Sequence, residues 1–149
     1  MILFISKYVN NLDAKGRVSV PAAFRANLVA QGQSSIVLYP SIKNPCIEGC
    51  SITRLEHLAK LIANLDPYSE ERDAFEAIIL GESHQLSFDN HEGRIVLPKE
   101  LISCSELSSK VVFVGKGEVF EIWDCDAFEK YMNKAKNIAI ANKGMLKNL

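Results

Sequence analysis

The sequence predicts an α+β protein, mainly β, in which one small β unit occurs twice. The clearest observation is a repeat, because "GRVSVP" at residues 16–21 returns as "GRIVLP" at residues 93–98. Short runs of β-branched and aromatic residues, bounded by Gly, Pro, Asn and Asp, surround both copies and are typical of strands. Longer helical patterns lie only between the copies and at the end of the chain. The expected order is therefore a β unit, two helices, a second β unit and a final helix.

The composition is that of an ordinary globular protein. The chain has 149 residues, of which 48% are apolar and 23% charged, and this size allows a buried core without disulfides or a metal. No apolar run approaches the ~18–20 residues of a membrane span, and no basic segment precedes the short apolar "ILFI" near the start. We therefore expect a cytoplasmic protein with no membrane partner.

The net charge of −1 hides a difference between the two ends of the chain. Residues 1–45 contain five basic residues against one acid, a balance of +4, whereas residues 46–149 contain 12 against 17, a balance of −5. A basic beginning on a near-neutral protein indicates a local anionic partner rather than a surface coated throughout for nucleic acid.

The first unit is expected to consist of short strands and one short helix. "NNLDAKG" has the Asn, Asp and Gly chemistry of a turn or an exposed loop. "RVSVP" alternates at period two and ends at Pro21, as a strand does. The next segment can form two helical turns with Phe24 and Leu28 on one face. The expected elements are strands at residues 3–9, 17–21, 34–40 and 46–52 and a helix at residues 22–28.

A helical insert follows the first unit. Thr53 and Glu56 have the spacing of a capping box at the start of one helix, which Pro67 ends. Ser69 can cap the next helix, and Gly81 terminates it. We expect the apolar faces of both helices to pack in the core or between subunits. These faces consist of Leu55, Leu58, Ile62 and Leu65 in the first helix and Phe75, Ile78 and Ile79 in the second.

The second unit repeats the order of the first. Its expected elements are strands at residues 84–89, 94–98, 110–115 and 118–123 and a short helix at residues 99–102, with a turn at Lys116-Gly117. Asp124 can cap a final helix that ends near Gly144. The apolar positions of that helix include Phe128, Met132, Ala135 and Ala139.

The first copy of the repeated turn carries the residues that suggest a function. Gly16 allows a positive φ or a tight approach at the end of the loop. Arg17 is held at the start of a strand, where its planar guanidinium suits a phosphate or a guanine edge. Asp13 lies four residues earlier, so its carboxylate can accept from the loop backbone or pair with the arginine. Lys15 at the loop tip is a cation suited to phosphate. Both DNA contact and simple closure of a β-turn fit these residues.

The second copy departs from this pattern. Gly93 and Arg94 repeat the Gly-Arg pair, but Asn90 stands four residues before the arginine and Asp89 stands five before it. Either the turn has gained one residue and Asp89 keeps the role of the acid, or Asn90 has replaced it. Glu92 and its neighbouring histidine stand where the first loop has lysine and alanine, so the local field is less positive. If the repeated turn contacts DNA, we therefore expect the first loop to make that contact and the second to be partly structural.

Metal binding and catalysis are weakly indicated. Cys46 and Cys50 are separated by three residues, but no second Cys or His pair has ligand spacing. The polar group of His84, Asp89, His91 and Glu92 is accompanied by no nucleophile elbow, metal-binding helix or phosphate loop. We expect a protein that is not an enzyme and that binds no metal, cofactor or small-molecule substrate.

The segment "LDAKGRVSVPAAFR" resembles the signature of the AbrB/SpoVT swapped-hairpin family. Two such units in a chain of this length resemble the MraZ family of transcriptional regulators. The similarity covers nearly the whole chain and includes "SKYVN", "EERDAFE", "GRIVLP", "FVGKG" and "FEIWD". It implies a duplicated swapped-hairpin barrel with short looped-hinge helices, in which the two halves interlock. It divides the chain into a first unit at residues 5–52, a helical insert at 53–82, a second unit at 83–126, and a C-terminal helix and tail at 127–149.

The resemblance also implies a function. Members of this family form ring-like homo-oligomers that bind repeated short boxes in promoter DNA, including the promoter of their own division and cell-wall gene cluster. In such a protein, acting at the nucleoid, the expected DNA-binding residues are Lys15, Arg17, Arg25, Lys7 and Arg94, and the residues that orient the loops are Asp13, Gly16, Asp89 and Gly93. The alternative is an antitoxin-like or other protein-interaction module of the same fold. Salt-dependent binding to promoter DNA would distinguish the two.

Overall fold

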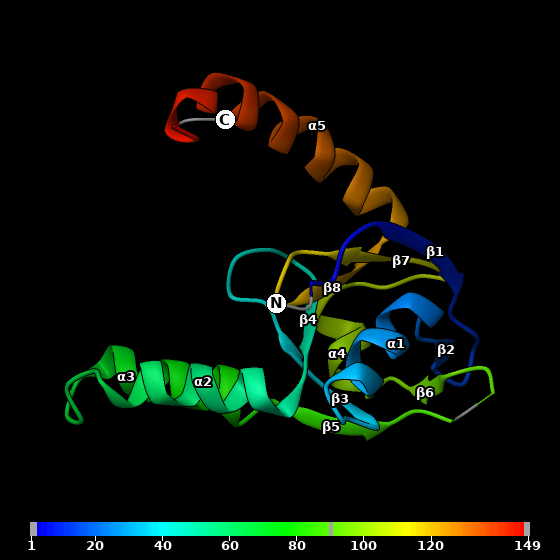
Figure 1. Cartoon of the computed structure of the whole chain (residues 1–149), viewed down its shortest axis with the longest axis horizontal. Helices are drawn as coiled ribbons and strands as arrows, with labels where there is room; N and C mark the ends of the chain where they lie inside the picture. The colour runs from blue at the N-terminus through cyan, green and yellow to red at the C-terminus, as the bar shows by residue number, and fades with distance from the viewer. Residues whose placement is uncertain (1–2, 90, 148–149) are drawn as a thin grey trace.

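The computed structural model describes residues 3–89 and 91–147, and shows a body of strands from which helical segments project (Figure 1). The strands are β1 (Lys7–Asn11), β2 (Arg17–Ser19), β3 (Ser35–Pro40), β4 (Ile47–Cys50), β5 (His84–Ser87), β6 (Arg94–Val96), β7 (Lys110–Gly115) and β8 (Phe120–Asp124). The helices are α1 (Ala22–Ala30), α2 (Ile52–Ala63), α3 (Glu70–Phe75), α4 (Lys99–Cys104) and α5 (Cys125–Ala141), with a π-helical segment η1 (Glu76–Leu80) and a 3₁₀ turn η2 (Lys143–Met145). The predicted α+β class is confirmed.

The strands of the two halves are interleaved. Within the described ranges they form a six-stranded antiparallel sheet in the order β1-β7-β8-β4-β3-β5 and a two-stranded antiparallel ribbon of β2 and β6. Strand β1 of the first half pairs with β7 of the second, and β5 of the second half pairs with β3 of the first. Strand β4 pairs with β8, and β2 pairs with β6. In the sheet, β7 and β8 of the second half therefore lie between β1 and β4 of the first, and β4 and β3 of the first half lie between β8 and β5 of the second.

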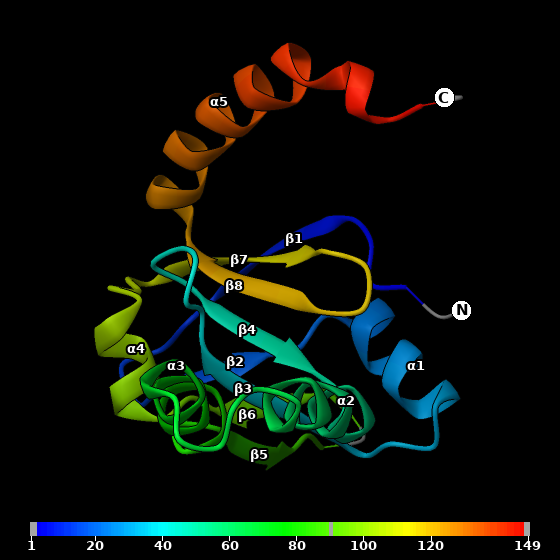
Figure 2. The same ribbon diagram turned by 90° about the vertical axis from the view of Figure 1, so that its left-hand side faces the viewer.

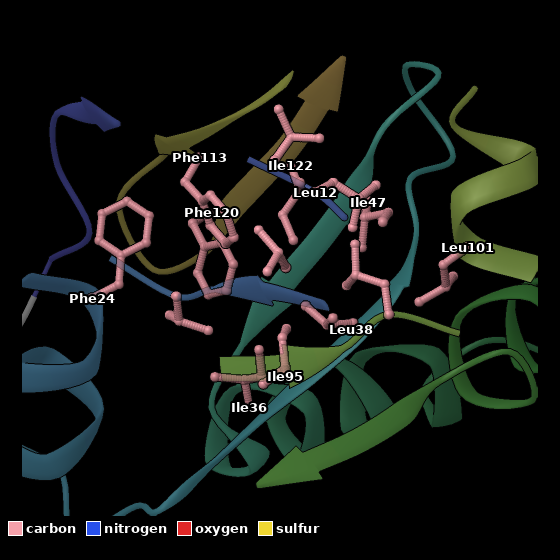
Figure 3. Packing of buried hydrophobic residues seen from close by; sticks show 14 of the residues in the cluster. Leu12, Phe24, Ile36, Leu38, Ile47, Ile95, Leu101, Phe113, Phe120 and Ile122 are labelled. Carbon is pink, nitrogen blue, oxygen red and sulfur yellow. The ribbon is translucent and has the colours of Figure 1, made fainter. Parts of the chain in front are cut away.

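The main core fills the space between the large sheet, the ribbon and helix α1 (Figure 3). Phe24 and Leu28 are buried on one face of α1, as the sequence predicts. The ring of Phe24 lies 5.2 Å from that of Phe120, centroid to centroid. Strands β2 and β6 turn Val18 and Ile95 into the same cluster. The ribbon is thus held to the sheet by its apolar side, which leaves its other side to solvent.

Helices cover parts of the outward face of the sheet. Helix α2 and segment η1 pack over β3 and β4, where Ile62 and Ile79 meet Val37. Phe128 in the first turns of α5 packs against Trp123 of β8, with 5.8 Å between ring centroids. Figure 2 shows that α5 then stands away from the sheet for most of its length. Its apolar positions are consequently only partly buried.

The helix caps are partly as predicted. Ser69 and Asp124 cap α3 and α5, and their side chains accept from backbone amides three residues later at 3.2 and 3.3 Å. The expected capping box at Thr53 is wrong, because Ser51 caps α2 and accepts from the Arg54 amide at 3.1 Å. Thr53 lies inside the helix. The second helix of the insert ends at Gly81, as predicted, but its last five residues are π-helical.

The first strand is displaced from its expected position. It begins at Lys7 rather than at residue 3 and extends to Asn11. Ser6 has a φ of +70°, which interrupts the extended backbone after Phe4 has formed an isolated bridge to Gly117. The turn before β2 is therefore shorter than the sequence suggests. In residues 3–89 and 91–147, every helix falls short of the length and hydropathy that a membrane span requires.

Candidate nucleic-acid interface

The first loop connects β1 to β2 and is organised by Asp13. Its Oδ1 accepts from the backbone amides of Lys15 at 2.9 Å and Arg17 at 2.8 Å, and its Oδ2 accepts from Arg17 Nε at 2.6 Å. Gly16 closes the turn with a φ of +80°, which favours glycine. The pKa of Asp13 is lowered mainly by the hydrogen bond from the Arg17 backbone amide and, next in size, by that from the Arg17 guanidinium. The carboxylate thus fixes both the loop and the direction of the arginine, whose side chain is 45% exposed.

The second loop connects β5 to β6 and is organised by Asp89. Its Oδ1 accepts from the backbone amides of His91, Glu92 and Gly93 at 2.7 to 3.0 Å. Its Oδ2 accepts from the Arg94 amide at 3.2 Å. These contacts, with the Glu92 amide foremost, lower the pKa of Asp89. Asp89 therefore binds the loop backbone across a turn that is one residue longer, and Asn90 lies outside the described residues.

The two arginines have different partners. Arg17 is bound by the aspartate of its own loop, whereas Arg94 Nη2 lies 2.5 Å from Glu92 Oε2. Both pairs are exposed, so solvent screens them and each contributes little to stability. Their effect is on direction, because each carboxylate limits where its guanidinium can point.

The β2–β6 ribbon brings the two arginines to one surface. In its register, Arg17 lies opposite Val96 and Ser19 lies opposite Arg94. Directly opposed residues point to the same side, so these four side chains share the outward face while Val18 and Ile95 point inward. A shallow depression of about 340 Å³ lies beside this face. It is lined by Asn10, Asn11, Asp13, Arg17, Val18, Ser19 and Arg94.

Four of the residues around this depression are not among the expected site residues: Asn10, Asn11, Val18 and Ser19. Asn10 and Asn11 belong to β1 rather than to the turn, and the Asn10 side chain donates to the Ser19 carbonyl at 2.6 Å. Ser19 lies in the alternating strand beside Arg94. Only the pairing of the two repeats with each other would have revealed this surface, and a sequence pattern gives no register between distant strands.

The other expected cations lie in different places. Lys15 is exposed at the tip of the first loop. Lys7 lies at the far end of β1 from that loop, with its Nζ 5.8 Å from the centroid of the Phe128 ring. Arg25 is half-buried on α1, and its Nε donates to the Val20 carbonyl at 3.0 Å. The loop and ribbon therefore hold Lys15, Arg17 and Arg94, whereas Lys7 and Arg25 contact other parts of the protein.

The cysteines and histidines form no comparable site. Cys46 precedes β4 and Cys50 is its last residue; both side chains are buried, and burial raises the pKa of both thiols. In the described part of the chain, no group of three or more His, Cys, Asp and Glu side chains has an arrangement that could hold a metal ion.

Comparisons with known proteins identify the family. A family model described as "MraZ protein, putative antitoxin-like" matches residues 79–148. The protein named transcriptional regulator MraZ of Rickettsia canadensis is 52% identical over 148 residues, which cover 99% of each chain. The proteins of the same name from Rickettsia felis and Rickettsia typhi are 51% and 50% identical, and the matches cover 99% or more of this chain and 99% of each relative. With such identity over its full length, this chain belongs to the MraZ family.

Proposed function

We propose that this protein is a sequence-specific DNA-binding transcriptional regulator that binds repeated promoter boxes upstream of its own division and cell-wall gene cluster as a homo-oligomer. It would act on nucleoid DNA in the cytoplasm. The name of its relatives supports regulation of transcription. The observation that carries the DNA contact is the β2–β6 ribbon, which presents Arg17 and Arg94 on one outward face.

A two-stranded ribbon has a width that the major groove of B-DNA admits. Arg17 is held by Asp13 with its guanidinium exposed, so it loses little conformational freedom when it forms a bidentate contact with a guanine edge. Lys15 at the loop tip is placed to contact phosphate, which adds affinity without sequence information. We propose Arg17 as the main base-reading residue, Lys15 as a phosphate contact and Arg94 as a weaker second contact.

The strand pairing supports a swapped-hairpin barrel as the scaffold. Exchanging the two halves converts the β1–β7 pair into the β5–β3 pair, and it leaves the β2–β6 and β4–β8 pairs unchanged. This is the pattern expected when two copies of one hairpin unit interlock. We propose residues 5–52 and 83–126 as these units, with residues 53–82 and 127–149 as additions to them.

Two projecting segments support self-association. Residues 130–147 contain five lysines and no acid, whereas residues 66–76 contain five acids and one arginine. Each segment also exposes large apolar side chains, including Ile138 and Ile140 on α5 and Tyr68, which is 95% exposed, before α3. We propose that α5 of one copy contacts the α3 region of the next. Such a head-to-tail contact uses two different surfaces and generates a ring if it closes.

Self-association would supply the affinity that one copy lacks. The few cations of a single loop support an affinity on the order of 10⁻⁴ to 10⁻⁶ M at physiological salt. Linking several copies makes later contacts intramolecular and can add roughly 10²- to 10⁴-fold. The expected target is therefore a set of direct repeats spaced by about one helical turn of DNA.

The test is a titration of promoter fragments that contain one, two and three boxes, followed by a fragment in which one box is shifted by half a turn. We expect affinity to rise with the number of boxes and to fall after the shift. Equal affinity for one and three boxes would contradict the proposal. An antitoxin-like module that acts only on a protein partner would show no salt-dependent preference for any of these fragments.

A further inference from the structure

Each loop glycine lies against a helix that belongs to the other half of the chain. Gly16 of the first loop faces α4, because a Cβ added to it would lie 3.5 Å from Ile102 Cδ1. Gly93 of the second loop faces α1, because a Cβ added to it would overlap the side chain of Arg25. Arg25 follows Pro21 by four residues, and Ile102 follows Pro98 by four. The two side chains therefore occupy corresponding positions in the two halves.

Arg25 belongs to a short hydrogen-bonded chain that ends at the second loop. Its Nε donates to the Val20 carbonyl at 3.0 Å, and the Val20 amide donates to the Gly93 carbonyl at 2.9 Å. In the other half, the Leu97 amide donates to the Gly16 carbonyl at 2.8 Å, and Ile102 adds only an apolar contact. The side chain of Arg25, through its Cδ, Nε and Cζ atoms, thus lies against Gly93 as Ile102 lies against Gly16.

The second loop has more need of this contact than the first. Arg17 is bound directly by Asp13, so its direction is set within the first loop. Asp89 uses its oxygens on backbone amides and none of them on the guanidinium of Arg94. The guanidinium of Arg94 pairs instead with Glu92, which belongs to the same backbone turn. The point from which Arg94 leaves the ribbon therefore depends on the backbone of this turn at Gly93, where Arg25 packs.

We propose that Arg25 is a positioning residue for the second DNA-binding loop. It holds Gly93, and through Gly93 it sets the distance and direction of Arg94 relative to Arg17 on the ribbon, without contacting DNA itself. This role rests on the proposed function, since the loop it positions is the proposed second contact. It assigns to Arg25 a part different from the direct DNA contact that the basic beginning of the chain suggests.

The experiment compares Arg25→Ala, Arg25→Ile and Lys43→Ala in the full-length protein. Lys43 is exposed in the loop between β3 and β4, so its removal controls for the loss of one positive charge. Two quantities are measured: the affinity for a promoter fragment as a function of salt, and the NMR chemical shifts of the Gly93 and Arg94 amides without DNA.

We expect Arg25→Ala to move both amide shifts and to weaken binding by roughly 3- to 30-fold, the range for residues that act through another residue. Arg25→Ile should restore the shifts and most of the affinity, because isoleucine reproduces the packing of Ile102 on Gly16. The slope of log affinity against log salt should stay that of the wild type in both variants, since no phosphate contact is lost. Lys43→Ala should move neither amide.

Equal losses in Arg25→Ala and Arg25→Ile, with a salt slope reduced by about 0.9 for each lost contact, would identify Arg25 as a phosphate contact and overturn the proposal. Unmoved Gly93 and Arg94 amides in Arg25→Ala would overturn it as well. A wild-type protein that does not bind promoter DNA would instead overturn the proposed function. The amide shifts, measured without DNA, would still decide whether Arg25 holds the loop.

Discussion

In the first loop the aspartate binds the arginine itself, whereas in the second loop it binds only the backbone. Asp13 reaches Arg17 Nε at 2.6 Å, while Asp89 accepts from four amides and leaves Arg94 to pair with Glu92. Both loops nevertheless deliver an arginine to the same face of the ribbon. The backbone course is therefore the shared feature, and the charges around each arginine differ.

This difference supports the proposed ranking of the two loops as DNA contacts. Each arginine is paired with an acid, but the charge balance of the loops differs. It is +1 for Asp13, Lys15 and Arg17 in the first loop and −1 for Asp89, Glu92 and Arg94 in the second. A polyanion is attracted to the first and repelled in part by Glu92 of the second. The packing of each glycine against the opposite half also shows that neither loop is built by its own unit alone.

Separating the halves should have the largest effect. Residues 1–80 keep β1 to β4 but lose β7, β6 and β8, which pair with β1, β2 and β4 respectively. Their apolar faces and strand edges would then be unpaired, so we expect no stable monomer. The measurement is an NMR spectrum of the fragment, and adding residues 81–149 is the matched control for rescue. A well-dispersed spectrum from a monomeric fragment would contradict the interleaved architecture.

The two arginines should differ in their effect on DNA binding. Arg17→Ala would remove the proposed base contact, which is worth about 1–3 kcal/mol, and the proposed oligomer would multiply that loss across its engaged subunits. Arg94→Ala should weaken DNA binding less, because the negative charge of the neighbouring Glu92 already repels phosphate. Gel shifts with a promoter fragment measure both losses, and circular dichroism checks that the fold is kept. A greater loss for Arg94→Ala would reverse the ranking of the loops.

Replacing either loop glycine by alanine should reduce stability, but a second substitution should restore stability at only one of the two positions. Alanine at either position must adopt a positive φ, which costs roughly 1–2 kcal/mol of unfolding free energy. Gly16→Ala also meets the Leu97 carbonyl at 3.2 Å, whereas Gly93→Ala meets the Arg25 side chain. We therefore expect Arg25→Ala to reduce the cost of Gly93→Ala and to leave that of Gly16→Ala unchanged. Chemical denaturation of the double variants measures this, and strictly additive costs at Gly93 would contradict the contact.

Local features of the fold could be predicted from the sequence because local residues cause them. Pro21 ends a strand, Phe24 and Leu28 lie one helical turn apart, and Asp124 has the side chain of a cap. The sequence predicts the wrong residue as the cap of α2, because Ser51 and Thr53 both carry a hydroxyl that can accept from a backbone amide. The choice between them depends on where β4 ends, which tertiary pairing decides.

The candidate site could be predicted only in part for the same reason. The repeat identified the loops of Asp13 and Asp89, whose contacts are local. The face shared by Arg17 and Arg94 depends on pairing between residues 77 positions apart, and the contact of Arg25 with Gly93 joins the two halves. Long-range pairing of this kind leaves no periodic signal in the sequence.

A smaller effect is expected from the tip of the first loop. Lys15→Ala would remove the proposed phosphate contact, so it should weaken binding evenly across DNA sequences and reduce the salt slope by about 0.9 for each engaged loop. The measurement is the affinity for specific and unrelated duplexes at several salt concentrations, with Lys43→Ala as the charge-matched control. An unchanged slope would remove Lys15 from the interface.

The smallest effect concerns the two aspartates, whose pKa values are both lowered in the folded protein. The Arg17 amide and then its guanidinium lower the pKa of Asp13, so Arg17→Ala should raise that pKa part of the way to the ordinary value of 3.8. Backbone amides, that of Glu92 first, lower the pKa of Asp89, so Arg94→Ala should leave it in place.

The direction of the accompanying stability change follows from the sign of these shifts. A carboxylate whose pKa is lower in the folded state stabilises the protein above its unfolded pKa, and this contribution is lost as pH falls through the folded pKa. Arg17→Ala should therefore reduce the loss of stability on acidification, and Arg94→Ala should not. NMR titration of the two carboxyl carbons below pH 5 measures the pKa values directly. An Asp89 pKa that rises as much as that of Asp13 would show that the second aspartate also acts on its arginine, and the distinction between the loops would then fail.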